Sequence, residues 1–234
     1  MADLPGLGQA IRSGDRDLAV ALTAQAIAEG VTPQQILDAM TEAMDVVGDD
    51  FQANLIFVPE MLVAARAMRE AMAQLEPVLV QAGIQPEARA IIGTVRGDLH
   101  DIGKNLVGMM WRGANIEVID LGTNVTAEQY VAALETHSPD LVGLSALLTT
   151  TMPSMASIVG TLRKADLSGA RIIVGGAPVN AEFASAIGAD AYAGDAGAAV
   201  VVARQLLGLG SPSDVRAGEG PGAATATEVR RVAR

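Results

Sequence analysis

The stretch Gly97-Asp98-Leu99-His100-Asp101-Ile102-Gly103 holds the residue types in this chain best suited to chemistry. It lies where an apolar strand is expected to end and a helix to begin, so His100 should stand on a loop at the edge of a sheet. One imidazole nitrogen there could bind a metal, while Asp98 accepts a hydrogen bond from the other, which fixes the tautomer and raises ligand basicity. Gly103 leaves the helix start bare, so that a flat, bulky group could approach the backbone.

Two further signals lie at the ends of other apolar strands. They are Ser145-Ala146-Leu147 and Gly175-Gly176, and since parallel strands share a direction, their ends should meet at one edge of a sheet and leave a slot. Taken singly, each signal has an ordinary interpretation: a solvated loop histidine beside a helix-capping aspartate, a serine bonded to its own backbone, and a glycine turn. Their combination in this order favours a binding site.

The positioning elements change in character near residue 85. Before it, apolar residues at helical spacing predict helices over 15–29, from Pro33 and from Pro59, and a break at Ser13-Gly14 would give a bundle of four. Residues 80–87 read as a linker, with a candidate hinge around residues 83–86. After it, five strand and helix pairs predict a parallel sheet with helices on both faces, and their number favours a flavodoxin-like or Rossmann-like order. The predicted strands are 89–95, 116–121, 141–147, 171–174 and 191–193, and the predicted helices are 102–111, 127–135, 153–164, 181–187 and 198–207.

The expected organisation is therefore a helical domain over 1–85, an α/β domain over 88–208 and a disordered tail over 209–234. Half of the 234 residues are hydrophobic and the mean hydropathy is +0.33, which suits a folded chain. The net charge of −11 argues against nucleic acid as a partner. With no cysteine, disulfides, iron–sulfur clusters and thiolate zinc sites are excluded. Neither a signal peptide nor an apolar run of about 18 residues is present, so we expect a soluble, cytoplasmic protein without a membrane partner.

The three motifs together resemble the cobalamin-binding domain of corrinoid methyltransferases, whose pattern is Asp-x-His-x-x-Gly, then Ser-x-Leu, then Gly-Gly. The helical part is similar to the capping bundle that precedes this domain in methionine synthase and in small corrinoid proteins. That second likeness rests on Phe57-Val58-Pro59-Glu60-Met61-Leu62 and on Ala64-Ala65-Arg66-Ala67-Met68. The resemblance covers about residues 5–208.

The resemblance implies a role for each matching residue. His100 would be the lower axial ligand to cobalt in place of the cofactor's own dimethylbenzimidazole, with Asp98 bonded to its distal nitrogen and Thr151 completing the relay in place of a serine. Phe57, Met61 and Leu62 would shield the upper, methyl-bearing face, although apolar helix residues more often simply pack. The remaining expected cofactor contacts are Gly97, Asp101, Ile102, Gly103, Ser145, Leu147, Thr149, Gly175 and Gly176.

The implied cofactor is cobalamin or a related corrinoid, cycling between methylcobalamin and cob(I)alamin. The implied function is that of a methyl carrier, loaded by a donor-specific methyltransferase and unloaded by a second methyltransferase to a thiol, a folate or a pterin, with a reductive activase as a third partner. Three alternatives remain open: a subunit of an adenosylcobalamin mutase, a cobalamin-based sensor, and a receiver-like signalling domain with Asp98 as phosphoacceptor.

Overall fold

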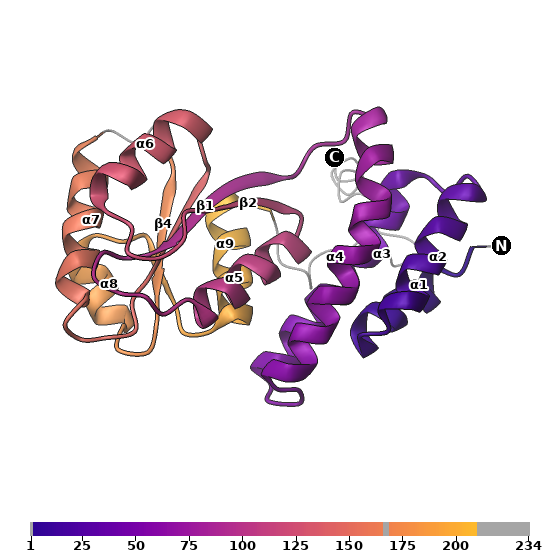
Figure 1. Ribbon diagram of the computed structural model, residues 1–234, viewed down its shortest axis with the longest axis horizontal. Coiled ribbons are helices and arrows are strands. Elements are labelled where there is room, and N and C mark those ends of the chain that lie inside the picture. Colours follow the sequence, from indigo (N-terminus) through magenta and orange to yellow (C-terminus); the bar gives the residue numbers. More distant parts are fainter. Residues whose placement is uncertain (1, 166–168, 210–234) are drawn as a thin grey trace, which may run out of the picture.

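The computed structural model describes residues 2–165 and 169–209, which form a helical bundle packed beside an α/β domain (Figure 1). Except for residue 209, the predicted tail over 209–234 lies outside the described residues. Within the described residues, no helix has the length and the apolar character needed to cross a membrane.

The bundle consists of the four predicted helices, α1 (Leu4–Ser13), α2 (Arg16–Ala28), α3 (Pro33–Gln52) and α4 (Val58–Gln81). Gly14 ends α1 in a left-handed conformation (φ 72°). A Cβ there would lie 2.6 Å from the side chain of Val63, so glycine permits α1 and α4 to approach closely. The bundle core is built largely from Leu, Ile, Met and Ala side chains, among them Leu7, Ile11, Ile36, Met40, Met44, Met61 and Leu75.

The helix α4 extends to Gln81 although Pro77 lies inside it. Leu75 and Leu79 are both buried, and this apolar face carries the helix past the proline. The predicted linker therefore begins after Gln81 rather than at Val80 and spans residues 82–87.

The sheet has five parallel strands in the order β2-β1-β3-β4-β5, which confirms the predicted flavodoxin-like fold. At its carboxyl edge the register aligns Thr94 with Ser145, Ser145 with Gly175 and Gly175 with Ala193. The predicted motifs after β1, β3 and β4 thus begin side by side. The strands are β1 (Ala88–Thr94), β2 (Ile116–Asp120), β3 (Leu141–Ser145), β4 (Arg171–Gly175) and β5 (Ala191–Ala193).

Helices cover both faces of the sheet (Figure 1). On one face, α5 (Ile102–Gly113) and α9 (Ala196–Leu207) lie between the sheet and the bundle and share one apolar core with it. On the other face, α6 (Ala127–His137), α7 (Met152–Lys164) and α8 (Ala181–Ile187) pack over a second core. The bundle is therefore attached to the sheet domain through α5 and α9, which also flank the carboxyl edge.

The predicted bounds in the α/β domain agree with the structure to within two residues. Strand β3 ends at Ser145 rather than at Leu147. The physical reason is that the main-chain N–H of Leu147 leaves the ladder and donates to the carboxylate of Asp98 at 2.7 Å.

Candidate functional site

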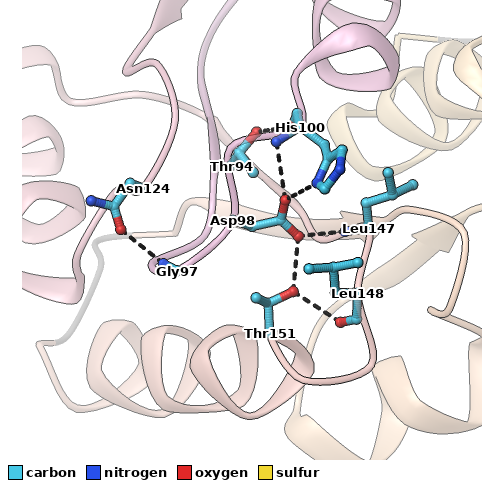
Figure 2. Close-up of polar contacts among 8 residues, drawn as sticks. All are labelled: Thr94, Gly97, Asp98, His100, Asn124, Leu147, Leu148 and Thr151. Carbon is cyan, nitrogen blue, oxygen red and sulfur yellow. Dashed lines mark hydrogen bonds and ion pairs between the residues drawn. The ribbon is translucent and has the colours of Figure 1, made fainter.

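The carboxylate of Asp98 is a fully buried acceptor for four donors (Figure 2). Its Oδ1 lies 2.7 Å from Nδ1 of His100 and 3.0 Å from the main-chain nitrogen of the same residue. Its Oδ2 accepts from the main-chain N–H of Leu147 at 2.7 Å and from Oγ1 of Thr151 at 2.8 Å. One side chain thereby joins the loops after β1 and β3 to the histidine.

The same contacts decide the charge of Asp98. Burial alone would raise the pKa of this carboxyl. The hydrogen bonds from the Leu147 and His100 amides, the His100 ring and the Thr151 hydroxyl outweigh that effect and hold the pKa of Asp98 well below its ordinary value. Asp98 is therefore a carboxylate throughout the physiological pH range.

The His100 ring is fixed at one nitrogen and open at the other. Because the carboxylate of Asp98 can only accept, a neutral ring carries its proton on Nδ1 and leaves the lone pair on Nε2. Among the described residues, no hydrogen bond reaches Nε2, and half of the side chain (51%) is exposed. The hydroxyl of Thr94 also donates to the main-chain oxygen of His100 at 2.9 Å, so both ring and backbone are held. This is the arrangement of an outward-facing metal ligand supported from behind.

A cavity of about 610 Å³ opens beside His100 along the carboxyl edge of the sheet. Eight of the predicted contact residues line it, and they come from the loop and helix after β1 and from the ends of β3 and β4. They are His100, Asp101, Ile102, Gly103, Ser145, Leu147, Gly175 and Gly176.

Three glycines that line this cavity serve two purposes. At Gly176 (φ 121°) a Cβ would lie 1.9 Å from the main-chain oxygen of Ala146, and at Gly175 it would lie 2.8 Å from that of Ala193. No atom lies within 4 Å of a Cβ placed on Gly103. The first two glycines thus allow the strand ends to approach one another, whereas Gly103 leaves open space at the start of α5.

Other predicted contact residues lie outside this cavity. Thr149 is exposed on the loop after β3. Gly97 lies in a turn (φ 86°), on the side of Asp98 that faces away from Leu147 (Figure 2). In the bundle, Met61 is buried in the core at 1% exposure, while Phe57 and Leu62 are 64% and 39% exposed. The shielding roles implied for these three residues stay predictions.

Several residues at the site were not singled out in the sequence. Thr94 binds the backbone of His100, and Asn124, in the loop after β2, accepts from the main-chain N–H of Gly97 at 2.8 Å (Figure 2). Thr94 is the last residue of β1 and Asn124 lies in the loop after β2, and both positions at the carboxyl edge were a readable signal. Phe51 of α3 and Trp111 of α5 line the cavity, and no local pattern marks them, because their place depends on how the bundle packs on the sheet.

The site offers one protein ligand, which suits a metal that a macrocyclic cofactor already holds. Across residues 2–165 and 169–209 there is no cluster of three or more His, Cys, Asp or Glu side chains able to hold a metal ion. A single supported imidazole beside a long, glycine-lined cavity instead suits a metal whose other positions are filled by its own cofactor. A corrinoid has this composition.

Comparisons with known proteins agree with this assignment. Models described as B12 binding domain match residues 88–203 and residues 5–76. A corrinoid protein of Desulfitobacterium hafniense is 36% identical over 213 residues, covering 89% of this chain and 99% of that protein. Trimethylamine corrinoid protein 1 of Methanosarcina mazei is 36% identical, covering 78% of this chain and 87% of that protein.

Solved structures show the same two-part architecture. A cobalamin-binding protein from Desulfitobacterium hafniense aligns with a TM-score of 0.74 at 29% identity, covering 88% of this chain and 99% of that one. The methanol:cobalamin methyltransferase complex MtaBC from Methanosarcina barkeri contains a chain that aligns with a TM-score of 0.78 at 28% identity, covering 92% of this chain and 83% of that one. The chain therefore belongs to the family of corrinoid proteins of methyltransferase systems, and its cofactor is a cobalamin.

Proposed function

We propose that this protein is the methyl carrier between two methyltransferases, one that loads a methyl group from a specific donor and one that delivers it to a thiol, a folate or a pterin. The observation that carries the proposal is the His100 ring, bonded through Nδ1 to the buried Asp98 and open at Nε2 beside the cavity. The names of its relatives point the same way, since one is a trimethylamine corrinoid protein and another belongs to a methanol:cobalamin methyltransferase complex.

In this function the chain holds, orients and tunes the cofactor. When bound, the corrinoid supplies a cobalt centre able to carry a methyl group. Nε2 of His100 would be the lower ligand to that cobalt. Asp98 keeps the Nδ1 proton in place and so sets how strongly Nε2 donates. Thr151 and the Leu147 amide bind the other carboxylate oxygen, and they hold Asp98 at that position.

The bundle would serve as the cover of the reactive face. Phe57 and Leu62 are apolar and exposed near the start of α4, and an apolar cover excludes water and oxidants from a reactive centre. A methyl group must enter and leave, so the cover has to move. The hinge we propose is the linker 82–87, in which Gly83 has a positive φ of 71°.

The system would include further proteins in the cytoplasm. The chain has no other domain among its described residues to bind a methyl donor or an acceptor, so donor and acceptor methyltransferases would be separate subunits, with a reductive activase to restore oxidised cobalt. A mutase subunit is less well supported, because one B12 binding domain model matches the sheet domain at residues 88–203 and a second matches the bundle at residues 5–76.

Reconstitution tests the ligand and the cofactor together. The protein is incubated with hydroxocobalamin and passed over a desalting column, and binding is followed by quenching of Trp111, the chain's only tryptophan, which lines the cavity. We expect a coloured complex. After a one-electron reductant converts its cobalt(III) to cobalt(II), its electron paramagnetic resonance should change when the histidines carry ¹⁵N. His100→Ala should abolish that change, and His137→Ala, at the other histidine, should preserve it. A signal showing benzimidazole still bound to cobalt would overturn the assignment of His100.

Transfer is tested with the reconstituted protein under reducing conditions. A donor methyltransferase and a ¹⁴C-labelled donor (methylamine, methanol, quaternary amine or methoxylated aromatic) are added in turn, followed by an acceptor methyltransferase. We expect label on the protein with one donor class and release only with the acceptor enzyme. A complex that never accepts label from any of these donors would contradict the carrier function while leaving the cofactor assignment intact.

A further inference from the structure

The loop after β2 is attached to the turn that carries Asp98. Asn124 lies in that loop with a left-handed backbone (φ 57°). Its Oδ1 accepts from the main-chain N–H of Gly97 at 2.8 Å, and its own N–H donates to the main-chain oxygen of Asp98 at 3.0 Å. A single residue thus binds two consecutive residues of the turn, on the side away from the cavity.

The neighbouring backbone continues this connection. The main-chain N–H of Thr94 donates to the oxygen of Gly122 at 3.0 Å, and that of Val125 donates to the oxygen of Thr94 at 2.9 Å. Thr94 in turn binds the main-chain oxygen of His100 through its hydroxyl. The segment 122–125 therefore binds Gly97 and Asp98 directly, and it supports His100 through Thr94.

Asp98 is supported from two directions as a result. On the cavity side, its Oδ2 is bound by the amide of Leu147 and the hydroxyl of Thr151. On the opposite side, its main-chain oxygen accepts from the N–H of Asn124, and Figure 2 shows Asn124 bonded to the preceding residue, Gly97. Because the carboxylate and the backbone are fixed by different loops, removing the Asn124 contacts leaves Asp98 bound but free to shift relative to His100.

We propose that Asn124 is a positioning residue for the His100 ligand, acting through the Gly97–Asp98 turn. The proposal rests on the proposed role of His100 as the lower ligand. It assigns Asn124 two separable contributions: an acceptor oxygen for Gly97 and a left-handed backbone that points its own N–H at Asp98. Asparagine and aspartate meet both needs at low cost, whereas glycine meets only the second.

This separation defines the variants. Asn124→Gly keeps the left-handed backbone and removes the acceptor, and Asn124→Asp keeps both. The matched control is Asn115→Gly, because Asn115 is also left-handed (φ 59°) and precedes β2 at the opposite edge of the sheet. Each protein is studied as the holoprotein with methylcobalamin and also without cofactor.

In the holoprotein, the absorbance spectrum distinguishes cobalt with a nitrogen ligand below from cobalt without one. We expect Asn124→Gly to shift the ligation equilibrium toward the unligated form by roughly 3- to 10-fold, the effect of losing about one hydrogen bond. Asn124→Asp should restore the wild-type spectrum, and Asn115→Gly should match the wild type. An Asn124→Gly spectrum equal to that of a ligated wild type would overturn the proposal.

In the cofactor-free protein, ¹⁵N NMR of the His100 ring reports the tautomer at fixed pH. We expect the wild type to hold the proton on Nδ1 and Asn124→Gly to lose part of this preference. If the wild type fails to ligate cobalt through His100, the proposed ligand role fails and this inference fails with it. If the wild type ligates cobalt through His100 but Asn124→Gly changes neither the absorbance spectrum nor the His100 tautomer, the inference alone is wrong. If Asn124→Gly then lowers only the free energy of unfolding, Asn124 has a purely structural role.

Discussion

The main-chain N–H of Leu147 donates to Oδ2 of Asp98 at 2.7 Å, across 49 residues of sequence. This bond takes the chain out of the β3 ladder and attaches the loop after β3 to the loop after β1. The other oxygen of the same carboxylate binds the His100 ring. Asp98 is thus the partner of the proposed ligand and also the joint between two strand ends, so its replacement should affect stability as well as ligation.

Replacing Asp98 with Asn should destabilise the cofactor-free protein. Each oxygen of the Asp98 carboxylate faces one main-chain N–H, that of His100 or that of Leu147. Whichever way an asparagine amide turns, its NH₂ group faces one of these donors and leaves it unsatisfied. We expect the free energy of unfolding, measured by urea denaturation, to fall by about 2–4 kcal/mol.

The matched control for that variant is Asp101→Asn. Asp101 is exposed, and among the described residues its Oδ2 accepts from one side chain, that of Asn105, at 3.1 Å. A surface change of this kind should alter the free energy of unfolding by less than about 0.5 kcal/mol. Equal effects of the two variants would mean that the buried contacts of Asp98 do not stabilise the fold.

Gly103→Ala should separate cofactor binding from folding. A Cβ at Gly103 meets no atom within 4 Å, and alanine is favoured over glycine in a helix by up to about 1 kcal/mol. The cofactor-free protein should therefore be as stable as the wild type or slightly more so. If the corrinoid lies over the start of α5, the added methyl group should weaken its binding at least about tenfold, as measured by quenching of Trp111 fluorescence.

Gly160→Ala provides the comparison, since Gly160 lies within α7 and its Cβ would also meet no atom within 4 Å. It should give a similar gain in stability with unchanged affinity. Unchanged affinity in Gly103→Ala as well would place the corrinoid away from the start of α5.

The fold was predictable because its signals are local. Apolar strands that alternate with capped helices specify the parallel sheet, and the bounds in the α/β domain agree to within two residues. The end of β3 was placed too late, since the partner that withdraws the Leu147 amide lies 49 residues away. Burial of Leu79 likewise prolongs α4 beyond Pro77, and that burial depends on the packed bundle.

The site was predictable only where its contacts are short in sequence. Asp98 and His100 are two residues apart, so their bond could be expected from spacing alone. Asn124 reaches Gly97 across 27 residues, which requires β2 to lie next to β1. Phe51 lines the cavity only because the bundle packs beside α5 and α9. Neither strand order nor the packing of the two parts can be read from a local pattern.

Phe57→Ala should leave stability nearly intact and expose the methyl group. The Phe57 side chain is 64% exposed, so its loss should change the free energy of unfolding by less than about 1 kcal/mol. If it covers the reactive face, bound methylcobalamin should lose its methyl group faster in light, as followed by absorbance. Met61→Ala differs, because Met61 is buried and its truncation should cost about 2–5 kcal/mol.

Val80→Ala is the matched control, as Val80 is 65% exposed near the other end of α4. It should change neither stability nor the rate of methyl loss. A Phe57→Ala protein with the photolysis rate of the wild type would remove Phe57 from the cover.

Tyr130 should make the protein lose stability at high pH. Its ring is fully buried, and its hydroxyl donates to the main-chain oxygen of Gly143 at 3.1 Å. Burial, and after it the charge of Asp120, raises the pKa of Tyr130 far above the ordinary value near 10. The folded state holds the phenol proton more tightly than the unfolded state. The contribution of the neutral Tyr130 to the free energy of unfolding is therefore complete below about pH 10 and is lost as the pH rises further.

The slope of this loss is at most about 1.4 kcal/mol per pH unit. Tyr130→Phe should lower the free energy of unfolding by about 1 kcal/mol at pH 8 through the lost hydrogen bond. Between pH 10 and pH 11, the free energy of unfolding of this variant should fall less steeply than that of the wild type. Tyr192→Phe, which changes the chain's other tyrosine, should retain the wild-type decline. Urea denaturation at each pH measures both slopes, and parallel curves for the wild type and Tyr130→Phe would show that ionisation of Tyr130 does not drive alkaline unfolding.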